Sequence, residues 1–388
     1  MKFRIFKVAL ASAFLSLSCA GNATEISVQQ AKDAISAVVL PAMEENDIPG
    51  MAVGLVWGEN SYTFNYGVAN HASQQPVADD TLFEIGSISK TFTATLASYA
   101  EVIGKLKLTD TTADHLPELA GTEFGKVQLM HLGTHTPGGM PLQVPEDIHN
   151  RDQLLEFFRE WKPAYQTGSV RTYANPSIGT LGWIAANSLG SDFTAAMTQT
   201  LFQPLNLNNT YLNVPAKKLS SYAWGYTKDN KPVRVNPGVL DDEAYGIKST
   251  ASDMLIFLKA NMAMLPLDDR LQTALINTRK RYFEVGKMAQ DLIWEEYAMP
   301  VDLQTLQEGN SSALILHPTP VTSTDTAEEV RSNVWVNKTG ATNGFGAYVA
   351  FVPDRRFGIV LLANKNWPNP HRVEVAHKIF SSLNSRVR

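Results

Sequence analysis

The sequence is poor in cysteine, in long apolar runs and in an excess of charge of either sign. Cys19 is the only cysteine among 388 residues, so no disulfide framework can hold the fold. No stretch after the first residues is long and apolar enough to span a bilayer. The chain has 33 basic and 38 acidic side chains, a balance that does not indicate binding to nucleic acid or to an anionic membrane surface. With 44% hydrophobic and 18% charged residues, the composition is that of a globular protein with a large core.

The N-terminal residues have the pattern of an export signal. Three basic side chains precede an apolar run over residues 8–17, and small residues follow it. This pattern predicts a signal peptide over residues 1–23, cleaved after Ala23 or, alternatively, after Ala20. A lipoprotein acylated on Cys19 is the other interpretation, but the residues just before Cys19 fit a lipid-attachment site poorly. Cleavage after Ala23 leaves a chain without cysteine, with 30 basic and 38 acidic residues and a formal net charge of −8.

A short motif stands at the entrance to a predicted apolar helix. Residues 83–91 form a tight turn that leads into an apolar segment, residues 92–103, without proline. A helix that begins near Ser87 places Ser87 and Lys90 one turn apart on the same face, where the amine can act on the hydroxyl. Unpaired backbone N–H groups at the helix start favour negative charge developing there. Ser-x-x-Lys arises by chance in a chain of this length, but a lysine in the first turn of an apolar helix needs a partner or a function.

Strand signals occur at both ends of the chain, and helix signals fill the middle. The pattern predicts an N-terminal helix over residues 27–40, which Pro41 kinks or ends, and a hairpin over residues 51–68. A helical region with loops rich in proline and glycine follows over residues 108–202. Three further strands lie within residues 333–364, and a last helix covers residues 370–383. We therefore expect an α/β (α+β) fold in which an antiparallel sheet is flanked by the N- and C-terminal helices. A mostly helical subdomain would be inserted between the two ends, in a single domain over residues 24–388, with the active site in the cleft between the subdomains.

Two more motifs match the first. Tyr173-Ala174-Asn175 follows a polar, loop-like segment, and Lys338-Thr339-Gly340 ends a predicted strand. Each motif is weak alone, but Ser-x-x-Lys, Tyr-x-Asn and Lys-Thr-Gly in this order form a strong signal for acyl transfer through a serine. A lysine with the ordinary pKa of about 10.4 is a poor base at neutral pH, and burial together with a second ammonium would lower that pKa. The sequence leaves open whether Lys90 or Tyr173 takes the serine proton.

With these motifs the chain resembles the serine β-lactamase and penicillin-binding-protein superfamily, and within it the class C β-lactamases, or cephalosporinases. The resemblance runs from about Ile26 to the last helix and includes residues 139–145, 222–226, 243–246 and 363–370. It implies a periplasmic enzyme, monomeric and without metal or cofactor, that hydrolyses small β-lactams, cephalosporins in preference. Class A enzymes differ in having Ser-Asp-Asn as the middle motif.

The resemblance also implies a role for each site residue. Ser87 would be the nucleophile, Lys90 and Tyr173 the proton-transfer groups, and the backbone N–H groups of Ser87 and Ala341 the oxyanion hole. Lys338, Thr339 and Gly340 would contact the substrate carboxylate. Asn175 would hold Lys90 and the acylamide side chain of the substrate. The remaining contacts around the pocket would be Gln143, Tyr245 and Asn369. Asn337 stands where many class C enzymes have histidine, and Pro176 follows the Tyr-x-Asn motif; neither change removes a group that the mechanism needs.

Four alternatives compete with this interpretation. A DD-peptidase or esterase of the same superfamily shares the acylation chemistry, and a sensor would acylate without turnover, although Tyr173 argues against a sensor. A zinc site on His131 and His135 lacks the glutamate of His-Glu-x-x-His, because Leu132 occupies that position. The Gly-x-Ser-x-Gly elbow of an α/β-hydrolase is absent from the chain.

Overall fold

A ten-stranded antiparallel sheet forms the centre of the protein in the computed structural model, which describes residues 25–236, 238–324 and 330–386. The predicted signal peptide lies outside these residues. In spatial order the strands are β13 (Thr322–Ser323), β9 (Arg281–Val285), β10 (Met288–Asp291), β11 (Glu295–Ala298), β14 (Val334–Ala341), β15 (Gly346–Val352), β16 (Phe357–Ala363), β1 (Gly50–Trp57), β2 (Asn60–Asn70) and β3 (Gln75–Pro76). Strands from the two ends of the chain meet where β16 pairs with β1, Leu361 opposite Val53.

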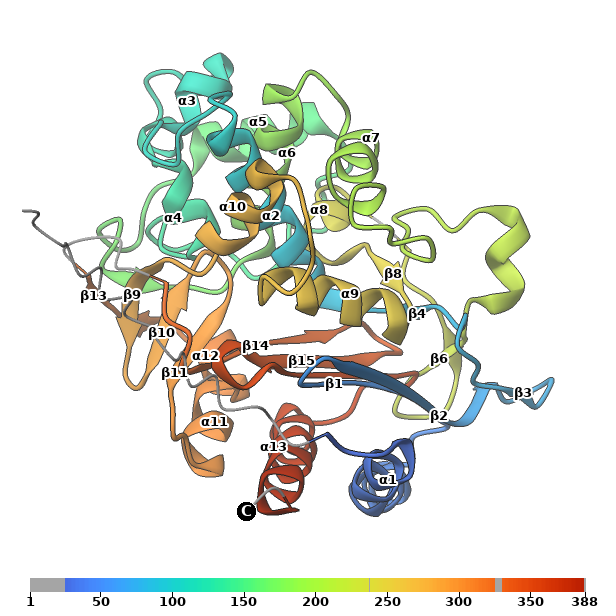
Figure 1. The fold of residues 1–388 in the computed structure, drawn as a ribbon. Coiled ribbons are helices and arrows are strands. Elements are labelled where there is room, and N and C mark those ends of the chain that lie inside the picture. The colour runs from blue at the N-terminus through green and yellow to red at the C-terminus, as the bar shows by residue number, and fades with distance from the viewer. Residues whose placement is uncertain (1–24, 237, 325–329, 387–388) are drawn as a thin grey trace, which may run out of the picture.

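The terminal helices cover one face of this sheet. The helices α1 (Val28–Glu45) and α13 (Asn369–Arg386) lie there together with α11 (Leu303–Gly309), as Figure 1 shows. Met51, Val53 and Leu55 of β1 pack toward them in one core cluster, whereas Ala52 and Val56 belong to the cluster on the opposite face. The alternation follows from the period of two along a strand.

The other face carries the remaining helices. The helices α9 (Ala251–Asn261) and α2 (Ser89–Val102) lie over it, and α3 (Thr112–His115), α5 (Arg151–Glu160) and α7 (Phe193–Met197) lie farthest from the sheet (Figure 1). The other helices are α4 (Leu129–Gly133), α6 (Asn175–Ser188), α8 (Asp241–Tyr245), α10 (Asp269–Asn277) and α12 (Ser312–Leu316). Small two-stranded sheets join β4 (Phe83–Glu84) to β8 (Lys248–Ser249), β5 (Val170–Arg171) to β12 (Thr319–Pro320) and β6 (Gly225–Tyr226) to β7 (Pro232–Val233). Among the described residues, no helix has the length and apolarity needed to cross a lipid bilayer.

The helix α2 is buried on nearly every side, which fits its apolar sequence. Its polar side chains find partners inside the core. Thr91 donates to Ile88 O at 2.7 Å and Thr95 to Thr91 O at 2.7 Å. Ring stacking of Phe92 on Phe257, with centroids 3.8 Å apart, joins α2 to α9. The start of α2 is therefore fixed on a rigid support.

The expected fold class is confirmed; one helix starts later than predicted, one of the two alternatives for Pro41 is excluded, and some strands were not predicted at all. The helix expected near Ser87 begins at Ser89, because residues 86–88 form a single 3₁₀ turn before it. Pro41 does not end α1, which continues to Glu45; burial of residues on the next turn of the helix offsets the backbone hydrogen bond that proline cannot make. The strands β9, β10 and β11 were not expected from the sequence.

Candidate active site

The turn that carries Ser87 packs backbone to backbone against the end of β14. Gly86 has a φ of +54°, and a Cβ there would lie 2.4 Å from Ala341 N. A Cβ on Gly340 would lie 2.0 Å from Ile85 O. The obstructing atoms are backbone, so only glycine permits these approaches. The chain on either side of Ser87 is thereby held against Ala341.

Lys90 lies fully buried beneath Ser87. Its Nζ donates to Ser87 Oγ at 3.0 Å and to Ala244 O at 2.9 Å. Burial, the largest effect, and the ammonium of Lys338 together lower the pKa of Lys90 to about 8 against the opposing effect of Tyr173. The amine is therefore far easier to deprotonate than an exposed lysine.

Tyr173 sits on the short segment between β5 and α6, 7% exposed. Two ammonium groups flank its ring, with Lys90 Nζ 5.2 Å and Lys338 Nζ 5.1 Å from the centroid. Burial raises the pKa of the phenol, but the charges of Lys338 and Lys90 outweigh it and bring the pKa down to about 8. Both candidate bases thus titrate within reach of physiological pH.

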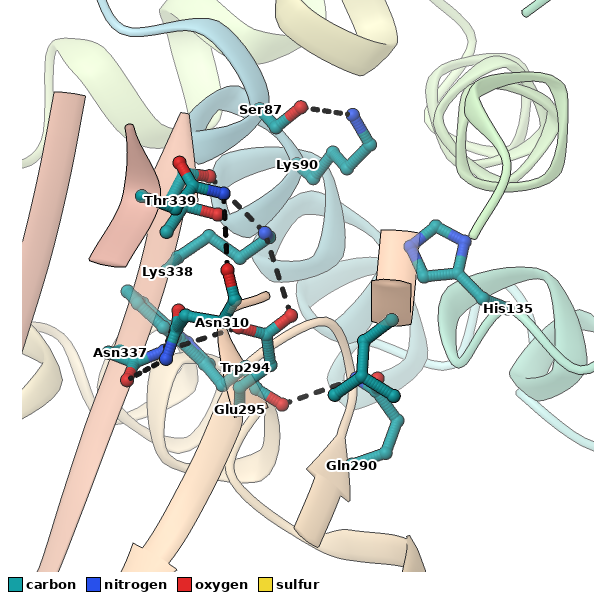
Figure 2. A network of polar contacts seen from close by, with 12 residues as sticks. Ser87, Lys90, His135, Gln290, Trp294, Glu295, Asn310, Asn337, Lys338 and Thr339 are labelled. Atoms are coloured by element: carbon teal, nitrogen blue, oxygen red, sulfur yellow. Dashed lines mark hydrogen bonds and ion pairs between the residues drawn. The ribbon is translucent and has the colours of Figure 1, made fainter. Parts of the chain in front are cut away.

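A buried carboxylate that the sequence analysis missed supports Lys338. Glu295 Oε1 lies 3.7 Å from Lys338 Nζ and accepts from Arg171 Nη2 at 3.2 Å, and Glu295 Oε2 accepts from Asn337 Nδ2 at 3.2 Å (Figure 2). Lys338 Nζ also donates to Thr339 O at 3.2 Å. Asn337 therefore serves as a neutral donor to the carboxylate that pairs with Lys338. No pattern in the sequence marks Glu295, which is remote from all three motifs.

A cleft of about 640 Å³ opens above these groups. Its size suits a small-molecule ligand. Nine of the eleven residues predicted from sequence line it: Ser87, Gln143, Tyr173, Asn175, Tyr245, Thr339, Gly340, Ala341 and Asn369. Lys90 and Lys338 are buried below the floor. The sequence analysis missed Arg234, which also lines the cleft and stacks on the rings of Tyr222 and Trp224 at 3.9 and 4.3 Å.

Asn175 contacts a different partner from the one expected. Its Nδ2 donates to Gln143 Oε1 at 2.7 Å, whereas the bonds of Lys90 go to Ser87 and Ala244. Asn175 Oδ1 is buried and has no hydrogen-bond partner among the described residues. Because Asn175 lines the cleft, this oxygen is available to accept a hydrogen bond from a ligand amide. Pro176 lies in the first turn of α6, where its missing N–H costs nothing.

The two histidines considered for zinc have separate partners. His131 Nδ1 bonds with Thr136 Oγ1 at 2.8 Å, and His135 Nδ1 accepts from Ala174 N at 3.2 Å. No group of three histidine, cysteine, aspartate or glutamate side chains able to hold a metal occurs within the described ranges. The site thus offers two nearby groups of lowered pKa beside a serine hydroxyl, an arrangement suited to nucleophilic attack on a carbonyl.

Comparison with known proteins adds four findings. Residues 35–384 match the family model described as Beta-lactamase. A protein named Beta-lactamase from Pseudomonas fluorescens is 46% identical over 352 residues, which cover 91% of this chain and 98% of that protein. The solved structure titled class C beta-lactamase in complex with cefoxitin superposes with a TM-score of 0.90 at 46% identity, covering 92% of this chain and 100% of that one. A structure titled Beta-Lactamase/D-Alanine Carboxypeptidase from Pseudomonas syringae has a TM-score of 0.89 at 48% identity and covers 90% of this chain and 98% of its own.

Proposed function

Because the chain belongs to the beta-lactamase family, we propose that it hydrolyses the β-lactam ring, with cephalosporins preferred, through an acyl-enzyme on Ser87. The resemblance to class C enzymes seen in the sequence is confirmed by its relatives. The observation that carries the mechanism is the 3.0 Å hydrogen bond between Lys90 Nζ and Ser87 Oγ at the floor of the cleft. At this distance the neutral amine of Lys90 can accept the hydroxyl proton, and the lowered pKa of Lys90 makes that neutral form accessible.

In acylation, Ser87 Oγ attacks the ring carbonyl carbon, and its proton passes to the Lys90–Tyr173 pair. The C–N bond of the four-membered ring breaks, and the pair returns the proton to the departing nitrogen. Tyr173 lines the cleft whereas Lys90 is buried, so we assign the final transfer to Tyr173. In deacylation the same pair takes a proton from water, which attacks the ester and releases the acid and the free serine.

Two groups of donors fit the charges that develop on the substrate. The backbone N–H groups of Ser87 and Ala341 would form the oxyanion hole, an effect of several kcal/mol. Thr339 lines the cleft above the buried ammonium of Lys338. Thr339, Lys338 and Gly340 together would bind the substrate carboxylate.

The opposite wall of the cleft would bind the acylamino side chain. Asn175 and Gln143 already share a hydrogen bond at the rim and offer amide groups to a substrate amide. Tyr245 would complete this wall, and Asn369, which also lines the cleft, would be a further substrate contact. Asn369 is held from below, because its Nδ2 donates to Asn310 O at 3.3 Å.

A D-alanine carboxypeptidase is the second candidate. Two of the similar solved structures carry that activity in their titles. The same serine chemistry would cleave the terminal peptide bond of an acyl-D-alanyl-D-alanine substrate, with D-alanine as the leaving group. The two activities differ in how fast water resolves each acyl-enzyme.

We further propose that the chain is exported to the periplasm after cleavage at Ala23 and acts as a monomer. The basic and apolar pattern of residues 1–23 supports export. Sequencing of the purified mature N-terminus and its molar mass in solution test these two points.

Hydrolysis of a chromogenic cephalosporin over many turnovers tests the function. Ser87→Ala should lower turnover at least about 10³-fold, because no nucleophile remains, and EDTA should have no effect. Ser98→Ala is the matched control: Ser98 lies on α2, the helix that follows the Ser87 turn, and its Oγ donates to Ala274 O inside the core. A single stoichiometric burst without turnover would refute the lactamase, and faster release of D-alanine from acyl-D-alanyl-D-alanine would favour the carboxypeptidase.

A further inference from the structure

His135 brackets Tyr173 through the backbone on both sides of it. His135 O accepts from Thr172 N at 2.8 Å, and His135 Nδ1 accepts from Ala174 N at 3.2 Å. The imidazole also packs on the phenol ring, with centroids 4.3 Å apart and planes tilted by 40°. One residue of a different loop therefore contacts Tyr173 and both of its neighbours.

The hydrogen bond determines the form of the imidazole. Because Nδ1 accepts an N–H, the ring proton is on Nε2, and the side chain is neutral. His135 is 1% exposed, and burial lowers its pKa well below 6.5, with further lowering by the charges of Arg171, Lys90 and Lys338. These cations come from β5, α2 and β14, and with the Tyr173 phenol they are the titratable and charged groups that face the ring. Acidification therefore leaves the acceptor in place.

We propose that His135 is a positioning residue: its neutral Nδ1 fixes the peptide between Tyr173 and Ala174 and so holds the phenol between Lys90 and Lys338. The proposal rests on the proposed function of Tyr173 in proton transfer. It assigns a role to a histidine that the sequence alone offered only as an incomplete zinc ligand.

The other bonds around Tyr173 do not replace this one. Ala174 is fully buried and is the N-cap residue of α6, and its own side chain makes no capping hydrogen bond. Without His135 Nδ1, the Ala174 N–H would be a buried donor that has lost this partner, which is an unfavourable state. Rotation of that peptide is the available relief, and it would move the phenol. A displacement of about 1 Å in a proton-transfer group costs about 100-fold in rate.

A pair of substitutions separates the acceptor from the volume of the ring. His135→Asn supplies an oxygen close to the position of Nδ1, and His135→Leu has a similar volume without an acceptor. His135 has a φ of +60°, which asparagine tolerates, and Leu240 shows that this chain accommodates leucine at a φ of +64°. Both replacements lose the aromatic ring, so a difference between them reports the hydrogen bond.

We expect His135→Leu to lower kcat about 100-fold with KM changed less, and His135→Asn to recover at least about ten-fold of that loss. Equal kcat in the two variants, whether near wild type or equally low, would overturn the proposal. His131→Leu is the nearby control, since His131 lies on α4 just before this loop and bonds to Thr136 rather than to the Tyr173 segment. Melting temperatures of all variants identify losses caused by unfolding.

Titration of the Tyr173 phenol gives a readout that does not need turnover. Its absorbance is isolated by subtracting the Tyr173→Phe form of each variant. In His135→Leu the pKa should rise from about 8 toward the ordinary value of about 10, because the phenol leaves its place between the two ammonium groups; in His135→Asn it should stay near 8. An unchanged titration in His135→Leu would refute the positioning role. If the wild type lacks β-lactam turnover, the proposed function fails, and the titration still decides the role of His135.

Discussion

Replacing Glu295 by glutamine removes a buried negative charge from under the cleft. Glu295 is 5% exposed and lies between the guanidinium of Arg171 at 3.2 Å and the ammonium of Lys338 at 3.7 Å. Glutamine has nearly the same shape, so the substitution changes charge with little change in volume. Its NH₂ group would face one of the donors that the carboxylate now satisfies.

The cost follows from the burial of the partners. Removing one member of a buried ion pair costs about 3–5 kcal/mol, because the charge left behind has no compensation. Arg171 and Lys338 are each 2% exposed. Arg171 keeps its bonds to Gln290 Oε1 at 2.7 Å and to Leu314 O at 2.8 Å, which places the cost at the lower end, about 3 kcal/mol. At about 2 °C per kcal/mol for a large domain, Glu295→Gln should melt about 6 °C below wild type.

Calorimetry at one scan rate measures this effect, with Glu156→Gln as the control. Glu156 pairs with Arg159 at 2.8 Å on the surface, where it is 61% exposed, and loss of such a pair costs less than about 1 kcal/mol. A second measurement is the Tyr173 titration: the charge of Glu295 raises that pKa, so it should fall in Glu295→Gln. A melting temperature within 1 °C of wild type, or a Tyr173 pKa that does not fall, would show that the carboxylate does not compensate these cations.

Two further predictions follow from the geometry of the site. Burial lowers the pKa of Lys90 to about 8, and the flanking ammonium groups lower the pKa of Tyr173 to about 8 against the effect of burial. Because a base acts only when it is unprotonated, kcat/KM should rise as the pH increases through about 8 and decrease below it. A profile that is flat from about pH 6 to 9 would contradict this assignment. Gly340→Ala should reduce both the acylation rate and the melting temperature, because its Cβ would lie 2.0 Å from Ile85 O. Gly358→Ala on the same sheet, whose Cβ would meet side chains at 3.4 Å, should melt close to wild type, and equal behaviour of the two variants would show that the turn can move away from β14.

The three motifs were accessible from sequence because each concentrates its functional groups in three or four consecutive residues. The hairpin from β1 to β2 and the strands β14 to β16 were equally accessible, since their apolar residues run between clear turn signals. The structure collects the predicted residues at one cleft, although their individual roles stay proposals. The division into two subdomains and the signal peptide also stay predictions.

The missed features share a physical cause. The strands β10 and β11 carry glutamate, glutamine and aspartate at buried positions, with Gln290 and Asp291 fully buried, and such residues indicate a surface loop when read from sequence alone. Gln290 and Glu295 share a partner distant in sequence, Arg171. The bond from His135 to Ala174 is of the same kind, because it joins two loops whose proximity only the fold creates. Long-range polar pairing leaves no periodic signal.

The charged side chains beneath the cleft link the lowered pKa of Tyr173 to the neutral form of His135. One buried carboxylate, Glu295, pairs with two buried cations, Arg171 and Lys338, while a third buried cation, Lys90, lies near the ring of Tyr173. The excess of positive charge lowers the pKa of Tyr173 despite its burial, and it favours the oxyanion and the carboxylate of a bound substrate. The same excess disfavours a further cation in contact with the phenol. A neutral imidazole at His135 adds no charge while supplying a hydrogen-bond acceptor, whereas a lysine or arginine there would add a fourth cation without one.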